Sequence, residues 1–131
     1  MKCIVVTPEK TVLEQDADFV ALPLSDGEMG VCERHTPMVG RIGAGELRVS
    51  LDGKIESYYV ESGFAEIYDD VVTLMVTHAW KSSILKVEVA EKQLADALAR
   101  PHNTPELAQI RERKIQTRRA RLRLARKVAG A

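Results

Sequence analysis

Residues 47–58 read LRVSLDGKIESY, and this run determines which class of fold the chain adopts. Asp52 and Gly53 stand between two short apolar-polar runs. An Asp-Gly pair in this setting is the strongest local sign of a β-hairpin, because its two residues accept the positive φ angles that a tight hairpin turn requires. The run therefore predicts two antiparallel strands joined at Asp52-Gly53.

The rest of the first 80 residues carries similar signals. Turn residues recur every eight to twelve positions, and Asp26-Gly27 and Asp69-Asp70 lie between further apolar runs. This spacing is typical of an antiparallel β-sandwich or barrel and not of alternating strands and helices. The other expected strands are Cys3–Val6, Ala17–Leu24, Phe64–Tyr68 and Val71–Thr77.

The pattern changes near residue 82. Val87, Ala90, Leu94, Ala97 and Leu98 recur at helical spacing, with charged residues elsewhere on the wheel. This arrangement predicts an amphipathic helix. It is expected to stop at residue 100, because the proline that follows excludes helical geometry before it. We expect two domains, a sandwich over residues 1–82 and a helical domain over residues 83–131.

A second helix is predicted from about Pro105 to Ala129. Thr104 is suited to cap it, and proline is favoured at the first helical position. Only residues 101–103 separate the helices, so we expect an antiparallel hairpin. The apolar stripe of the second helix is thin, and like charges repel along it, so the helix is predicted to need a partner. The expected stripe is Leu107, Ala108, Ile115, Leu122, Ala125, Val128 and Ala129.

Charge is distributed unevenly along the chain, although the formal net charge is zero. Residues 1–104 hold ten bases and seventeen acids, whereas residues 105–131 hold nine bases and two acids. Such asymmetry indicates an acidic partner for the basic segment. Three interpretations stay open: a solvated face, a nucleic-acid-binding arm, or a movable latch for an acidic protein surface. Aromatic residues are absent from residues 81–131, so a nucleic-acid arm would lack a stacking platform.

Several functions find no support in the sequence. No serine or cysteine stands in a recognisable nucleophile motif beside a histidine. Cys32 and His35 have the spacing of two metal ligands, but a zinc site needs two more in similar spacing, so no metal or other cofactor is expected. The two cysteines, Cys3 and Cys32, suit a reducing compartment. No apolar run has the 18 residues that a membrane span requires, and a cytosolic protein is expected.

Several ordered blocks of this sequence resemble one known family. They are Val6–Lys10, Leu22–Val31, His35–Val39, Gly43–Arg48 and Val60–Glu66. Together they are similar to the N-terminal signature of the epsilon subunit of F-type ATP synthases, whose mitochondrial counterpart is called delta. The resemblance covers about residues 1–80 and is specific. The helical hairpin agrees with the family in length and position, and less in sequence.

The resemblance implies an α+β protein with a β-sandwich of about ten strands and a C-terminal helical hairpin. It implies a rotor subunit of the central stalk, without an active site, bound to the gamma subunit and seated on the membrane c-ring. Such a subunit couples proton flow to rotation and lies peripherally on the cytoplasmic face of the membrane. It can inhibit ATP hydrolysis when its helices extend towards the alpha/beta catalytic head, where basic residues meet an acidic region of beta.

The resemblance also assigns residues. The turn Ser25–Gly30, with Glu28 foremost, would face the polar loops of the c-ring, and Glu33, Arg34 and His35 would lie close to gamma or the ring. The full contact set is Ser25, Asp26, Gly27, Glu28, Met29, Gly30, Arg34 and His35. The candidate inhibitory contacts with beta are Arg111, Arg113, Lys114, Arg118, Arg119, Arg121, Arg123 and Arg126.

Two departures from the family pattern matter. Some bacterial relatives bind regulatory ATP through an Ile/Leu-Asp-x-x-Arg-Ala motif in the first helix. The aligned stretch here is Leu85–Ala90, in which Lys86 replaces the acid and Val89 replaces the arginine. No nucleotide-binding site is therefore expected. Residues Cys32–Arg34 also stand where a Pro-Gly turn is common, which leaves the shape of that loop open.

Overall fold

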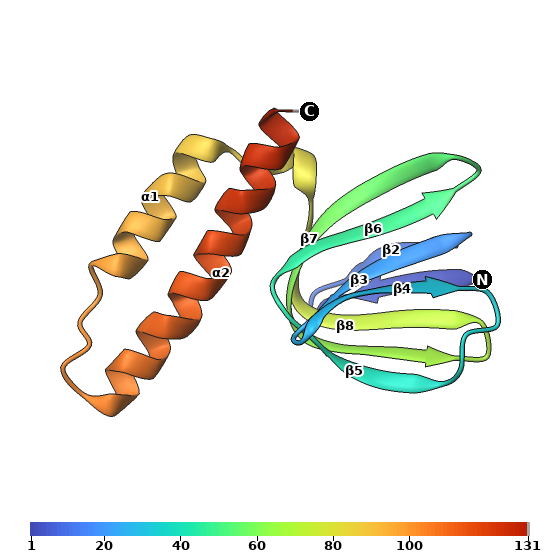
Figure 1. Cartoon of the computed structure of the whole chain (residues 1–131), viewed down its shortest axis with the longest axis horizontal. Coiled ribbons are helices and arrows are strands. Elements are labelled where there is room, and N and C mark those ends of the chain that lie inside the picture. Colours follow the sequence, from blue (N-terminus) through green and yellow to red (C-terminus); the bar gives the residue numbers. More distant parts are fainter. Residues whose placement is uncertain (131) are drawn as a thin grey trace. The chain divides into compact units, whose positions relative to one another are not determined.

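The predicted hairpin is confirmed in the computed structural model, which describes residues 1–130 (Figure 1). Asp52 and Gly53 both have positive φ, +52° and +79°. This is the mirror-image turn whose twist matches that of the flanking strands. The strands pair antiparallel from Leu51 opposite Lys54 to Gly45 opposite Val60.

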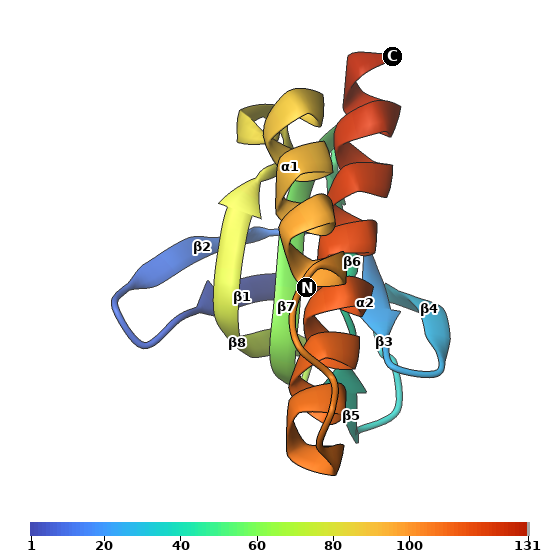
Figure 2. The same cartoon turned by 90° about the vertical axis from the view of Figure 1, so that its left-hand side faces the viewer.

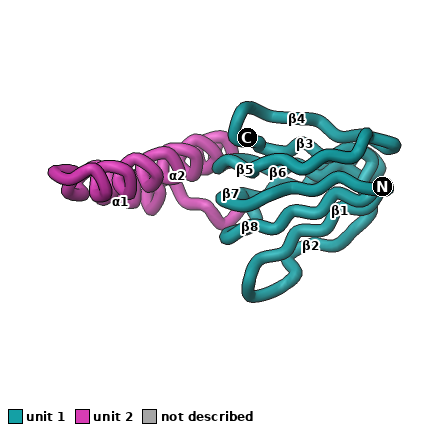
Figure 3. The backbone as a smooth tube through the Cα atoms, turned by 90° about the horizontal axis from the view of Figure 1, so that it is seen from below, with its two compact units in different colours: residues 1–81 teal, residues 82–131 magenta. Residues whose placement is uncertain are grey.

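The described residues form eight strands, one 3-10 turn and two α-helices. The strands are β1 (Lys2–Val6), β2 (Thr11–Asp16), β3 (Phe19–Leu24), β4 (Gly27–Cys32), β5 (Met38–Ile42), β6 (Gly45–Leu51), β7 (Lys54–Tyr68) and β8 (Val71–Lys81). After the 3-10 turn Ser82–Ile84 come α1 (Val87–Leu98) and α2 (Pro105–Ala129). Contacts divide the chain into two compact units, Met1–Lys81 and Ser82–Ala131 (Figure 3).

The strands form a sandwich in which β7 belongs to both layers. Its first half pairs with β6, which continues to β3 and β4. Its second half pairs with β5, whereas β8 pairs with both halves of β7 and continues to β1 and β2 (Figure 2). About ten strands were expected and eight are present. Part of the difference arises because two segments expected to be separate strands are the two halves of β7.

The partner of β7 changes from β6 to β5 at Ser62 and Gly63, where the backbone leaves regular strand geometry. Ser62 and Gly63 both have positive φ, +60° and +156°. A Cβ atom on Gly63 would lie 1.9 Å from the carbonyl oxygen of Met75, so only glycine fits there. The hydroxyl of Thr77 donates to the carbonyl of Glu61 at 3.0 Å and fixes the strand beside Ser62.

One pair of strands differs from the fully antiparallel arrangement that was expected. β1 pairs parallel with β8, from Lys2 opposite Val71 to Val6 opposite Met75. A parallel pair needs a long connection, and here the whole sandwich lies between the two strands in sequence. Local turn signals carry no information about such a pair, which explains why the prediction missed it.

The core of the first unit is mainly aliphatic. Leu22, Leu47, Val60 and Leu74 are fully buried between the layers, and Cys3 is buried with them. Burial of each such aliphatic side chain stabilises the fold by about 1.5–3 kcal/mol. The sandwich therefore supplies a rigid framework for the side chains on its surface.

The second unit is the predicted antiparallel hairpin. The hydroxyl of Thr104 accepts a hydrogen bond from the backbone N–H of Leu107 at 3.2 Å and caps α2. An apolar cluster of Ala90, Leu122 and Ala125, with partly buried neighbours in the same unit, joins the helices. α1 ends at Leu98, two residues before the expected end.

The predicted apolar stripe of α2 is correct only in its middle. Ile115, Leu122 and Ala125 are buried, but Ala108 and Ala129 at its ends are exposed. A spacing of seven drifts around a straight helix of 3.6 residues per turn, so alanines several turns apart leave the packed face.

Candidate interaction surfaces

The residues expected to meet a c-ring lie at the turn between β3 and β4. Ser25, Asp26, Gly27 and Glu28 are all exposed there, followed by half-buried Met29 and exposed Gly30. Backbone hydrogen bonds hold the base of this turn, from the N–H of Ser25 to the carbonyl of Arg41 at 2.9 Å and from the N–H of Gly43 to that of Pro23 at 2.8 Å. The turn is exposed, and its base is fixed.

Glu28 is engaged by a residue that sequence reasoning did not single out. The guanidinium of Arg48 donates to both of its carboxylate oxygens, from Nη2 to Oε1 at 2.8 Å and from Nη1 to Oε2 at 3.1 Å. Arg48 Nη1 also lies 3.4 Å from Oε1 of Glu46, whose Oε2 accepts a 2.5 Å hydrogen bond from the Ser57 hydroxyl. The hydrogen bonds to Glu28 are the largest cause that raises the pKa of Arg48, and desolvation opposes them.

Arg34 and His35 form a separate group. They follow β4, whereas Glu28 lies at the start of that strand, and the six residues of β4 span roughly 20 Å. Arg34 has a φ of 60°, and its backbone N–H donates to Oδ1 of Asp70 at 2.6 Å. His35 is half-buried, with Nδ1 2.7 Å from the carbonyl of Thr36. The expected contact set is thus divided between the two ends of one strand.

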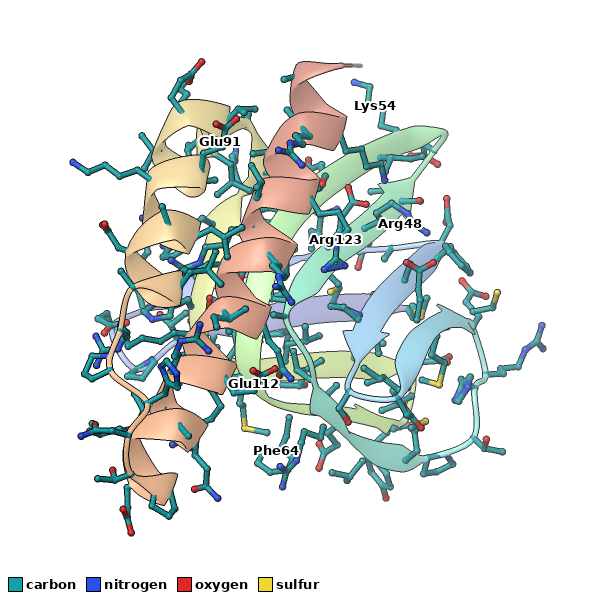
Figure 4. All side chains as sticks on the ribbon, turned by 60° about the vertical axis from the view of Figure 1, so that its left-hand side comes forward. Arg48, Lys54, Phe64, Glu91, Glu112 and Arg123 are labelled. Atoms are coloured by element: carbon teal, nitrogen blue, oxygen red, sulfur yellow. The ribbon has the colours of Figure 1, made fainter. Side chains whose placement is uncertain are left out.

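A face with large exposed apolar side chains covers β5, β7 and β8. Phe64 lies opposite Met75 in the register, and both are about half exposed, 48% and 49%. Val39 and Tyr68 belong to the same outward face because they follow the alternation of these strands, and they are 68% and 64% exposed. The guanidinium carbon of Arg41 lies over the ring of Phe64, 5.8 Å from its centroid, and Figure 4 labels Phe64.

An apolar hollow of about 370 Å³ adjoins this face at Ser62 and Gly63. Its lining comes from the end of β1 and from β7 and β8. The residues that line it are Val6, Thr7, Pro8, Ser62, Gly63, Met75, Val76 and Thr77. Sequence reasoning missed the face and the hollow, although the outward phase of Phe64 and Tyr68 against buried Ala65 and Ile67 is a signal for the face.

The basic residues of α2 do not all occupy the same environment. Arg113, Arg119, Arg123 and Arg126 are exposed, Arg111, Lys114 and Arg118 are half-buried, and Arg121 is only 7% exposed. Figure 4 labels exposed Arg123.

Arg111 closes the hairpin at the end of α1. Its Nη2 and Nε atoms donate to the carbonyl oxygen of Leu98 at 3.1 and 3.4 Å. That carbonyl is one of the helix-end acceptors that have no partner within their own helix. Arg111 therefore acts inside the hairpin in this structure.

Other chemistry finds little support in the described residues. Within residues 1–130, no three histidine, cysteine, aspartate or glutamate side chains gather as a metal site would require. Both cysteines are free; Cys3 is buried, and desolvation raises its pKa to about 12. None of the helices described here has the length and hydropathy to traverse a bilayer.

Comparison with known proteins gives a consistent result. Residues 1–82 match the family model described as "ATP synthase, Delta/Epsilon chain, beta-sandwich domain". The chain is 45% identical over 126 residues to the ATP synthase epsilon chain of Rhodopirellula baltica, covering 96% of this chain and 98% of that one. It is 34% identical over 125 residues to the ATP synthase epsilon chain of Desulfitobacterium hafniense, covering 95% and 89%.

Solved structures share the fold. A chain in the mitochondrial ATP synthase of Euglena gracilis, determined as OSCP/F1/c-ring, matches with a TM-score of 0.82 and 22% identity over 98% of this chain and 80% of that chain. A chain in the central stalk/c-ring of the Tetrahymena thermophila mitochondrial ATP synthase matches with a TM-score of 0.70 and 12% identity, covering 97% and 94%. At these identities the likeness establishes the architecture.

Proposed function

This chain belongs to the ATP synthase delta/epsilon family, and from that premise we propose that it is a non-catalytic rotor subunit of a proton-translocating F-type ATP synthase. In this role it binds the gamma subunit and the c-ring in the central stalk and couples rotation to ATP synthesis. It has no turnover and needs no cofactor. It is peripheral to the membrane and is held at the cytoplasmic face through the complex.

The single observation that carries this proposal is the exposed apolar face of β5, β7 and β8. Val39, Phe64, Tyr68 and Met75 are large side chains that a free-standing sandwich would gain by burying. Large apolar side chains exposed together on one face mark protein interfaces, and aromatic residues and methionine are enriched in interface cores. On this face they stand beside exposed Glu66 and Arg41. We assign this face to gamma, with Arg34 and His35 at its border.

The c-ring contact is assigned to the turn Ser25–Gly30. Its residues are exposed, its base is held by backbone hydrogen bonds, and Glu28 supplies a charged acceptor. Polar loops of a membrane ring offer N–H donors and cations that match such a turn. A charged turn on a rigid sandwich would transmit torque without crossing the membrane.

Inhibition of ATP hydrolysis is assigned to α2. The cluster that joins α1 to α2 is small: Ala90, Leu122 and Ala125 are buried, with partly buried Leu85, Val87 and Leu94 packed against them. Separating the helices has to overcome the burial of these side chains, and it makes the cations of α2 available to an acidic surface of beta. The proposed contacts are Arg111, Arg113, Lys114, Arg118, Arg119, Arg121, Arg123 and Arg126. Arg111 would become available only after the hairpin rearranges, and Arg121 only after the contacts that bury it are broken.

Co-purification tests the proposal. Tagged full-length chain, expressed with the other stalk and ring subunits, should retain gamma and the c-ring through washing. Substitution of Phe64 and Met75 by serine should release gamma, while substitution of Ile55, an exposed residue on the β6–β7 hairpin, should not. Salt-dependent binding to DNA without any affinity for gamma would instead favour an interaction module with a nucleic-acid-binding tail. Turnover of ATP by the purified chain would contradict the proposal.

A further inference from the structure

The pair of Glu28 and Arg48 joins two strands that are not neighbours. Glu28 is on β4 and Arg48 is on β6, with β3 between them. Ala21 of β3 is opposite both Gly30 and Arg48 in the register, so these three positions share one face of the sheet. Ala21 is very small and leaves a low surface over which the arginine side chain crosses β3, while the ring of Phe19 lies against Gly30 on β4.

The geometry of the pair constrains the carboxylate. Each oxygen of Glu28 accepts one hydrogen bond from a different nitrogen of Arg48, at 2.8 and 3.1 Å. This fork fixes the plane of the carboxylate as well as its position. Arg48 is itself held from its other side by Glu46, only 14% exposed in its side chain, which is hydrogen-bonded to Ser57.

Glu28 nevertheless remains open to a partner. Its side chain is 52% exposed, and a carboxylate has about four acceptor positions, of which Arg48 occupies two. The free positions face away from the arginine. The site therefore presents an ordered acceptor to any N–H donor or cation that approaches the β3–β4 turn.

We propose that Arg48 is a positioning residue that holds the Glu28 carboxylate ready for a cationic or N–H donor loop of the c-ring. The inference rests on the ring contact proposed above and adds the residue that orders it. A glutamate side chain loses considerable rotamer freedom when it is immobilised at an interface. Because Arg48 orders Glu28 in the free protein, that loss does not oppose binding.

The proposal can be separated from simple attraction of charge. Glu28, Arg48 and Glu46 together carry one net negative charge. Removal of Arg48 makes this surface more acidic, and attraction alone would then strengthen its binding to a cationic loop. Positioning predicts the opposite, because the freed glutamate must be ordered on binding. Arg48→Lys keeps the positive charge but cannot form the two parallel hydrogen bonds to Glu28, so it tests the geometry of the contact separately from its charge.

The test measures the affinity of the full-length chain for detergent-solubilised c-ring in Arg48→Lys, Arg48→Gln, Glu28→Ala and the double variant Glu28→Ala/Arg48→Gln. Lys2 and Glu14 supply a matched control, because they form another exposed cross-strand ion pair, at 3.3 Å. We expect both Arg48 variants to bind about three- to tenfold more weakly, the factor given by ordering one long side chain. Lys2→Gln should bind as the parent does.

The double variant should bind no more weakly than Glu28→Ala, because Arg48 acts through Glu28. Unchanged or tighter binding of Arg48→Lys and Arg48→Gln beside a weakened Glu28→Ala would overturn the inference and leave the ring contact standing. Additive losses in the double variant would also overturn it, since Arg48 would then bind the ring itself. Unchanged binding of Glu28→Ala would overturn the ring contact at this turn, and the positioning role with it. Thermal melting of each variant separates these results from a loss of folding.

Discussion

Replacement of Arg111 by methionine should loosen the helical hairpin. Methionine has a similar length and helix propensity but cannot donate to the carbonyl of Leu98, which Arg111 reaches at 3.1 and 3.4 Å. Arg113→Met is the matched control. It removes the same charge two residues away on α2, from an exposed side chain. Comparison of the two variants therefore cancels the effects of net charge, helix dipole and propensity.

The expected magnitude follows from the contact. A hydrogen bond to a charged group contributes about 1.5–3 kcal/mol when it is well protected. Exposed ionic contacts contribute about 0–1 kcal/mol. The contact of Arg111 is exposed, and one of its two distances is long, so we expect about 1 kcal/mol. That value corresponds to a roughly fivefold larger population of the open hairpin, and therefore to roughly fivefold faster exchange of the amide hydrogens that opening exposes.

Amide hydrogen exchange of the isolated full-length protein is the appropriate assay. The amides at the end of α1 and in the first turns of α2 should exchange about fivefold faster in Arg111→Met than in Arg113→Met, with the sandwich unchanged. Equal protection in the two variants would refute the reasoning. In the assembled enzyme, the direction in which Arg111→Met changes the rate of ATP hydrolysis is also informative. Loosening the hairpin should lower ATP hydrolysis if extension inhibits, whereas loss of a beta contact should raise it.

Three further predictions test other parts of the molecule. Truncation after Arg100 should leave sandwich folding and gamma binding intact and raise the ATPase rate of the complex. Replacement of Arg119, Arg123 and Arg126 by glutamate should also raise the ATPase rate. An unchanged ATPase rate in this triple variant would exclude an electrostatic contact. Gly63→Ala should lower the unfolding free energy of the sandwich by at least about 3 kcal/mol, seen as a large drop in melting temperature, because its Cβ would collide with the Met75 carbonyl oxygen. Gly53→Ala is the control: no atom lies within 4 Å of its Cβ, so it should lower the unfolding free energy by only about 1 kcal/mol. Cys3 should resist alkylation at pH 8 while exposed Cys32 reacts, and modification of both thiols at equal rates would contradict this. The unfolding free energy should fall as the pH rises from 9 to about 12, because only the unfolded chain ionises Cys3 in that window.

Local chemistry made much of the fold predictable from the sequence. The Asp52-Gly53 turn, the Asp69-Asp70 turn and the capped start of α2 at Thr104 each depend on residues adjacent in the chain, and all are present in the structure. The existence of the helical hairpin follows from the same local preferences, whereas the continuity of β7 across two expected strands does not. Local features need no knowledge of distant contacts.

Contacts between distant segments could not be predicted in this way. Arg48 stands next to apolar residues in sequence and reads as an ordinary outward strand residue, yet its partner is twenty residues earlier on β4. The parallel pairing of β1 with β8 and the burial of Arg121 likewise depend on register and on tertiary packing. Phe64 and Tyr68 were assigned to a strand, but only the paired register shows that they share an exposed face with Met75.

The charge pattern of α2 has an energetic consequence for any acidic partner. Lys114 and Arg118, Arg119 and Arg123, and Arg123 and Lys127 are like charges four residues apart, and each pair destabilises the helix by about 0.2–0.5 kcal/mol. Within the hairpin this repulsion opposes the small apolar cluster around Leu122. An acidic surface would remove the repulsion as it forms contacts, so the same side chains that weaken the closed hairpin would strengthen the extended state. The balance between the two states should therefore shift towards the hairpin as ionic strength rises, because salt screens exposed charges on a partner surface more than it weakens apolar packing.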